Sequence, residues 1–283
     1  MLSQRKIHQD SKSSDETNET ASLISSVFKN DKYDSDNLKK NSLLCNFGEL
    51  PVWLQDNCDI LKGYRRPTFS YLKCVDSLFY VHNESVNIWS HLVGAISFIF
   101  LGLITYNYVL SYHSSIIWWD VAVFYIFLLG AMVCLGLSSS FHTFCCHSEK
   151  ICVALANKFR TPEFRWFRTG LFIFLGLSGI VPLAHALIIY GIELSVNVIS
   201  LNWLIVMGVF YIIGALIYGS RIPERWFPGK FDIYGSSHQI FHFFVVAAAF
   251  VHYFGVIRAM MFWHEKNHNC ELDVSMLKPS FAF

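Results

Sequence analysis

Two histidines, His238 and His242, stand at the start of a long apolar run that reaches His252. On a helix a spacing of four residues places both imidazoles on one face, one turn apart, which suits two ligands of a single metal ion. Ionisable side chains at the mouth of a membrane helix are costly unless they are paired, hydrated or bound to a metal. The alternative interpretation is that both rings hydrogen-bond backbone or water at the membrane interface. This spacing alone leaves both interpretations open.

A third histidine, His142, lies at the corresponding end of another predicted membrane helix, so the three imidazoles are expected at similar depth on the same side of the membrane. Three neutral imidazoles with one open position are typical of a catalytic zinc site and not of a closed structural one. Ser138 precedes His142 by one helical turn and is expected to orient a ligand or a metal-bound water. The metal hypothesis is therefore zinc at His142, His238 and His242, with Ser138 beside it.

The other histidines and the cysteines have weaker signals. Cys145 and Cys146 are near His142 and could bind a soft metal, but buried structural cysteine explains them better. The eight cysteines include no CxxC pair and no spacing typical of a disulfide framework. The histidines without a partner at metal-ligand spacing are interpreted as packing or hydrogen-bonding residues: His82, His91, His147, His185 and His252.

Composition identifies the elements that must position these residues. Apolar residues make up 53% of the 283-residue chain, and charged residues only 15%. No Lys or Arg occurs in 88–141, 170–219 or 231–257. Apolar blocks of this size without a basic residue are typical of membrane helices, so we predict an all-α, polytopic transmembrane bundle. Because the basic residues are explained by membrane orientation, we predict no nucleic-acid partner.

Five membrane helices are predicted, and the charges between them indicate their orientation. The loops 142–168 and 220–235 carry five and three basic residues, eleven more precede the first helix, and the connections 111–115 and 191–200 carry none. The positive-inside rule therefore places the N-terminus in the cytoplasm and, after five crossings, the C-terminus outside. The predicted helices are Asn87–Tyr112, Ile116–Ser140, Thr169–Tyr190, Leu201–Gly219 and Ser236–Val256.

These elements divide the chain into four predicted parts. Residues 1–45 are polar with few aromatics, and we expect a disordered cytoplasmic tail. Residues 46–87 form a cytoplasmic juxtamembrane segment with an amphipathic helix around 69–81. The transmembrane bundle is predicted to cover 88–257, and an extracellular C-terminal tail 258–283.

Several long motifs, in order, resemble the progestin and adipoQ receptor family, related to hemolysin III, and most closely its adiponectin receptors. The resemblance covers roughly residues 46–257. The motifs are Leu50-Pro-Val-Trp-Leu-Gln-Asp-Asn, His82-Asn-Glu-Ser-Val-Asn-Ile-Trp-Ser-His-Leu, Phe141-His-Thr-Phe-Cys-Cys-His-Ser-Glu-Lys150, Thr161-Pro-Glu-Phe-Arg, Gly176-Leu-Ser-Gly-Ile-Val-Pro, and Arg221-Ile-Pro-Glu-Arg through His252.

The resemblance implies a plasma-membrane receptor of seven helices with a cytoplasmic N-terminus, linked to signalling in lipid metabolism. It places the family's zinc on His142, His238 and His242, with the nearby serine at Ser138, and implies a zinc-held water and ceramidase-type hydrolysis. The implied partners are ceramide-like lipids or fatty acids, an extracellular adiponectin-like protein ligand, and further copies of the chain or its family members in an oligomer.

The chain departs from the family pattern between Lys150 and Thr161. There the family has two further membrane helices, whereas only 151–160 remains here, so a whole helical hairpin is missing. In the family the third helix supplies an aspartate that holds the zinc-bound water, and nothing in 151–160 replaces it. We therefore expect reduced zinc occupancy and weak or absent hydrolysis.

The missing hairpin leaves two explanations and three functions open. The chain is either a shortened isoform or gene-model error, or a genuine five-helix variant. It is expected to act as a receptor of the adiponectin type, as a ligand-independent lipid amidase, or as a catalytically silent partner that assembles with full-length family members.

Overall fold

The computed structural model describes residues 42–107, 115–156 and 162–266. The chain divides into the units 1–43 and 44–283, so the predicted disordered tail lies almost wholly outside the described residues. Leu44–Cys45 form strand β1, which pairs antiparallel with β2, Tyr64–Arg65. Cys45 is buried with Leu50 and Tyr64 in a small apolar cluster, so the last two residues of the predicted tail pack on the segment that follows.

The segment before the first long helix folds into short helices. η2 is Phe47–Glu49, η3 is Val52–Leu54, α2 is Tyr71–Asp76 and η4 is Ser77–Phe79. The Ser70 side chain accepts a hydrogen bond from the Lys73 backbone N–H and caps α2, because a helix start leaves such donors unpaired. A helix therefore does occupy the stretch 69–81 where the sequence predicts one.

Five spans among the described residues are long and apolar enough to cross a membrane, as predicted. One of them comprises two helices, α6 and α7. The helices are α3 (Ser85–Thr105), α4 (Trp118–Phe144), α6 (Arg165–Ser178), α7 (Ile180–Val198), α8 (Leu201–Ser220) and α9 (Ser237–Lys266). The short apolar remnant after α4 forms α5, Glu149–Ala156. The all-α membrane fold is confirmed.

The helix bounds differ from the prediction most clearly in the third and the last span. The third span begins earlier, breaks at Gly179 and continues past Gly191 to Val198, so most of the predicted loop 191–200 is helical. Gly191 adopts a φ of 68°, a conformation open to glycine, and this kinks the helix without ending it. The last helix continues beyond residue 257 to Lys266, because its final turn is held by Trp263, whose ring N–H donates to the Val198 carbonyl at 3.1 Å.

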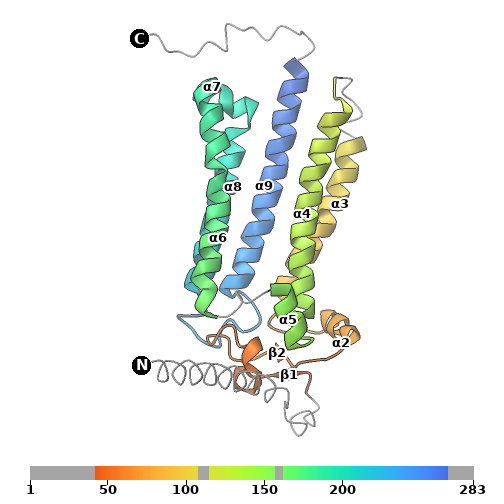
Figure 1. Ribbon diagram of the computed structural model, residues 1–283, viewed down its shortest axis with the longest axis vertical. Helices are drawn as coiled ribbons and strands as arrows, with labels where there is room; N and C mark the ends of the chain where they lie inside the picture. Colours follow the sequence, from red (N-terminus) through yellow and green to blue (C-terminus); the bar gives the residue numbers. More distant parts are fainter. Residues whose placement is uncertain (1–41, 108–114, 157–161, 267–283) are drawn as a thin grey trace, which may run out of the picture. The chain divides into compact units, whose positions relative to one another are not determined.

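Helix α9 joins two helix pairs (Figure 1). On one side α3 packs against α4, on the other α6 packs against α8, and α9 contacts α3, α7 and α8. The core shared by α3, α4 and α9 is built from large apolar side chains such as Phe98 and Leu128. Inside it the hydroxyls of Thr105 and Tyr253 hydrogen-bond at 2.6 Å, which pairs two polar groups in apolar surroundings.

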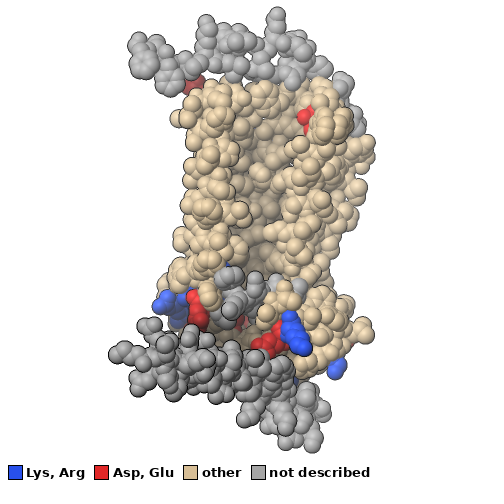
Figure 2. Space-filling model, viewed as in Figure 1, with Lys and Arg blue, Asp and Glu red and all other residues tan. Residues whose placement is uncertain are grey.

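On the face that Figure 2 shows, the Lys and Arg side chains gather at the end of the bundle that carries α2 and α5, and acidic side chains show at both ends. The last turn of α4 and the first turn of α9 lie at this same end (Figure 1). The elements that carry the three candidate metal ligands are thus brought to one depth.

The contact between α8 and α9 depends on a glycine. A Cβ added at Gly214 would lie 2.8 Å from the Phe244 Cβ, an atom that cannot move without its backbone, whereas nothing lies within 4 Å of a Cβ at Gly208 in the same helix. We therefore expect Gly214→Ala to lower the free energy of unfolding by about 1–3 kcal/mol, the usual cost of overpacking. Gly208→Ala is the matched control and should not destabilise. Thermal unfolding in detergent measures both, and equal midpoints would contradict this account of the packing.

Candidate metal centre

Three histidines predicted as metal ligands converge at the charged end of the bundle. His142 comes from the last turn of α4, and His238 and His242 come from the first two turns of α9. One ring nitrogen from each lies within 4.8 Å of the others. The plane of the His142 ring makes angles of 87° with the ring of His238 and 70° with the ring of His242, so His142 is stacked on neither of them. His142 and His242 are buried and His238 is half-buried.

The start of α9 is fixed by a carboxylate from the loop before it. Glu224 is fully buried and accepts hydrogen bonds from the Ser237 backbone N–H, at 2.7 Å, and from the Ser237 hydroxyl. An acidic group at a helix N-terminus satisfies a free N–H and interacts favourably with the helix dipole. Glu224 therefore holds the turn that carries His238.

The outer nitrogens of two candidate ligands are engaged by oxygen atoms from the start of α3. His142 Nδ1 donates to Glu84 Oε2 at 2.8 Å, and His242 Nδ1 donates to the Asn87 carbonyl at 3.0 Å. A carbonyl oxygen and an ionised carboxylate only accept, so Nδ1 carries the proton in both rings. Nε2 of each ring is then left with its lone pair, the arrangement usual for metal-binding histidines.

Glu84 is a functional residue that the sequence reasoning missed. Its Oε2 also accepts from the Asn87 side-chain amide at 2.6 Å. Burial alone would raise the pKa of this carboxyl, but the imidazoles of His142 and His238 and these hydrogen bonds outweigh burial and hold the pKa well below its ordinary value. Glu84 is therefore a carboxylate at neutral pH. Its place in the His82-Asn-Glu motif, three residues before Asn87, was the available signal.

His91 also lies in this region, although it has no partner at metal-ligand spacing in the sequence. Its ring stacks on His242 with the centroids 3.7 Å apart and the planes 14° apart. Both of its nitrogens are buried and make no hydrogen bond to a described residue. The structural interpretation fits three others better: His82 accepts from the Glu84 N–H at 3.1 Å, His147 stacks on an aromatic ring and His252 packs edge-on against one.

Ser138 lies one turn before His142 on α4 and is half-buried. Its hydroxyl makes no hydrogen bond to another residue that the structure describes, so its orienting role stays a prediction. The neighbouring Ser139 instead donates to the Ile88 carbonyl at 3.2 Å and ties α4 to α3.

The two cysteines after α4 do not join the histidines. Cys145 Sγ donates to the His142 carbonyl at 3.5 Å, and Cys146 Sγ lies 3.6 Å from the Thr143 carbonyl. Within the described ranges, the one group of three or more histidine, cysteine or acidic side chains that could hold a metal is the three histidines.

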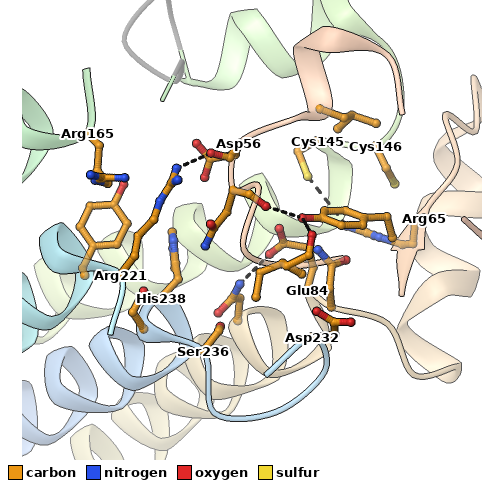
Figure 3. Close-up of a pocket in the computed structure, with 18 of the residues that line it drawn as sticks. Asp56, Arg65, Glu84, Cys145, Cys146, Arg165, Arg221, Asp232, Ser236 and His238 are labelled. Carbon is orange, nitrogen blue, oxygen red and sulfur yellow. Dashed lines mark hydrogen bonds between the residues drawn. The ribbon is translucent and has the colours of Figure 1, made fainter. Parts of the chain in front are cut away.

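His238 also lines a pocket at this end (Figure 3). The pocket is also lined by three arginines and by the carboxylate of Asp56. The arginines are Arg165, Arg168 and Arg221. Arg168 Nε donates to the Tyr218 hydroxyl at 2.9 Å, and the Tyr218 ring meets His238 edge-on at 5.0 Å. A polar or negatively charged group in this pocket would thus lie beside the histidine cluster.

Comparison with known proteins agrees with the fold. The profile of the haemolysin-III-related family matches residues 79–155 and 150–253. The adiponectin receptor protein of Drosophila melanogaster is 40% identical over 270 positions, which cover 77% of this chain and 60% of that protein. The ADIPOR-like receptor IZH2 of Saccharomyces cerevisiae is 37% identical, covering 80% and 87%. Heptahelical transmembrane protein 1 of Arabidopsis thaliana is 32% identical, covering 81% and 84%.

The comparisons also bear on the missing segment. The two matched stretches overlap at residues 150–155, where the sequence departs from the family pattern. The alignment with the Drosophila protein has 270 positions, but it covers only 77% of the 283 residues of this chain. The Drosophila protein therefore has residues in the aligned region that have no counterpart here. The aligned part is also less than two thirds of that protein's own length. With five apolar spans, a match to most of the bundle and relatives of this identity, the chain belongs to the haemolysin-III-related family and is an adiponectin-receptor-like, multi-pass membrane protein.

Proposed function

We propose that the chain is a receptor of the adiponectin type that holds zinc on His142, His238 and His242 and links an extracellular signal to lipid metabolism. The observation that carries the metal part is the convergence of three imidazoles, two of which have Nδ1 engaged by oxygen atoms. Nitrogen donors of this number and type suit zinc and leave one position open. Zinc, when bound, would supply a Lewis acid and an acidified water near neutral pH.

The chain's own residues would bind and orient the reacting lipid. Glu84 and the Asn87 carbonyl hold two of the ligand rings, and Arg168 with Tyr218 presents polar hydrogens beside His238. The substrate class that we propose is a ceramide-like lipid, with a fatty acid as the product bound in the same pocket. Two of the named relatives, from Drosophila melanogaster and Saccharomyces cerevisiae, are called receptors, which supports a ligand or lipid partner in general terms.

The carboxylates near the cluster support the expectation of weak hydrolysis. Three of them line the pocket, Asp56, Glu84 and Asp232. Glu84 is bonded to His142, and Asp232 accepts from the Leu61 N–H at 2.7 Å. Asp56 Oδ1 faces Arg168 at 3.7 Å. Two of these carboxylates are thus held by hydrogen bonds to protein groups, and Asp56 Oδ1 faces a guanidinium without a hydrogen bond to a described residue, in contrast to the water-holding aspartate that the family resemblance places on the missing third helix.

The proposed location is the plasma membrane, with the N-terminus in the cytoplasm. Lys and Arg side chains gather at the end that carries the three histidines (Figure 2). This supports a cytoplasmic position for that end, because cytoplasmic loops are rich in basic residues. An adiponectin-like protein would then bind at the opposite end. Assembly with further copies or with seven-helix relatives is the alternative role, and it applies if the chain is silent alone.

The metal assignment is tested by zinc content. We expect the purified chain to hold less than one zinc per chain, and to lose it in His142→Ala, His238→Ala and His242→Ala. His252→Ala, on the same helix as two of the ligands, is the matched control and should retain zinc. Metal analysis by mass spectrometry gives the ratios. Zinc that persists in the three variants would contradict the ligand assignment, and one tightly held zinc per chain would contradict the expected loss of occupancy.

The role of Glu84 is tested by Glu84→Gln. The amide keeps the shape of the side chain but removes the charge opposite the His142 N–H. We expect zinc affinity to fall about 10- to 100-fold, the usual effect of removing an outer hydrogen-bond partner of a ligand. Glu163→Gln changes an exposed carboxylate and should have no effect. Competition against a coloured chelator measures both affinities, and equal values would show that Glu84 does not orient a ligand.

Hydrolysis is tested by fatty-acid release from ceramide in lipid nanodiscs, with and without an adiponectin-like protein. We expect weak or no release from this chain, compared with a full-length relative measured under the same conditions. Release that increases with the protein ligand would support the receptor, and ligand-independent release the amidase. Co-purification with a seven-helix relative, without activity alone, would support the silent partner. Release equal to that of the relative would contradict the predicted effect of the missing hairpin.

A further inference from the structure

Two cysteines meet below the end of α4, outside the histidine cluster. Cys74 belongs to α2 and Cys146 follows the last turn of α4, yet their sulfur atoms are 3.7 Å apart. Both side chains are buried, with exposed fractions of 0% and 2%. Neither the metal centre nor the proposed hydrolysis uses these thiols.

The pair lies beside a buried cation. Arg65 is 3% exposed, and its guanidinium donates to the Ser77 hydroxyl at 2.7 Å and to the Thr143 carbonyl at 3.0 Å. On the other side the Thr68 hydroxyl hydrogen-bonds Cys74 Sγ at 3.0 Å. A nearby cation and a hydrogen-bond donor both favour a thiolate, which is the reactive form of cysteine.

The pKa values of the two thiols are shifted in opposite directions. The hydrogen bond from Cys146 lowers the pKa of Cys74 to about 7, with Thr68 and Arg65 acting in the same direction against burial. The same hydrogen bond, together with burial, raises the pKa of Cys146. Near neutral pH Cys74 is therefore partly ionised and faces a Cys146 thiol.

We propose that Cys74 and Cys146 are an oxidation site, in which a small hydroperoxide converts the two thiols into a disulfide. The Cys74 sulfur attacks one peroxide oxygen, the O–O bond breaks, and a sulfenic acid and water form with hydrogen peroxide. The Cys146 sulfur then attacks the Cys74 sulfur, the S–S bond forms and the S–O bond breaks. The oxygen and the remaining protons leave as a second water. Two electrons pass from the thiols to the peroxide.

The distance between the two sulfur atoms favours a disulfide between Cys74 and Cys146. Closing the sulfur separation from 3.7 Å to the disulfide length of about 2.05 Å requires a shift of less than 2 Å, within reach of side-chain rotation. Because both thiols are buried, a small hydroperoxide would reach them only when the contact between α2 and the end of α4 opens, and bulky oxidants are excluded. The bond would join α2 to the turn four residues after His142, whose carbonyl accepts from Arg65. Oxidation would thereby fix the position of α2 against the end of α4.

The test is peptide mapping of the full chain in nanodiscs after treatment with hydrogen peroxide. Cleavage before aspartates places Cys74 on fragment 59–75 and Cys146 on fragment 120–231. We expect the two fragments to be joined without reductant and separated by dithiothreitol. The protein should lose two free thiols, while exposed Cys58 stays free for a maleimide.

Three variants assign the bond. Cys145→Ser changes a neighbouring buried cysteine and should still give joined fragments, whereas Cys74→Ser and Cys146→Ser should give none. Wild-type fragments that stay separate, or that carry only sulfinic acid, would overturn the proposal, and this result does not depend on how the variants fold. Fragments joined equally in Cys146→Ser would overturn it as well, because another cysteine of 120–231 would then be the partner.

Discussion

The hydrogen bond from His142 to Glu84 is the contact on which this end of the bundle depends. It joins the last turn of α4 to the residue before α3, so it fixes how far the two helices slide past each other. A polar group buried without a partner costs a few kcal/mol, which makes any shift that breaks this contact unfavourable. The first turn of α3 also supplies the Asn87 carbonyl to His242. One helix start therefore orients imidazole rings from two other helices, and the candidate metal centre follows from that arrangement.

The segment before α3 and the loop before α9 complete this arrangement from outside the spans. Arg65 caps the carbonyls at the end of α4, where four C=O groups lack helical partners. Glu224 does the same for the N–H groups that open α9, and it also accepts from the Asn57 side chain at 3.1 Å. None of these contacts comes from the region 150–161, where the family pattern is interrupted. This explains how the three histidines can stay together although a hairpin is missing.

The parts of the fold and site that the sequence predicts are those set by local pattern. The five spans follow from long apolar blocks without a basic residue, and the histidine pair follows from a four-residue spacing on one helix. Glu84 and His91 could not be found in this way, because their partners His142 and His242 lie far along the chain and only packing brings them together. The helical turns after Gly191 were not predicted, because this glycine and the charged Glu193 are typical of a loop. In the structure α7 packs against α8 and α9, and this packing keeps 192–198 helical.

The central claim is that His142, His238 and His242 bind one zinc ion through their nitrogens. Zinc X-ray absorption of the purified chain tests it most directly, because the distance from zinc to its nearest atoms distinguishes the donor types. The account predicts nitrogen or oxygen atoms at about 2.0–2.1 Å with the outer-shell signal of imidazole rings. Sulfur atoms at about 2.3 Å would instead place the metal on cysteines such as Cys145 or Cys146, and would contradict the claim.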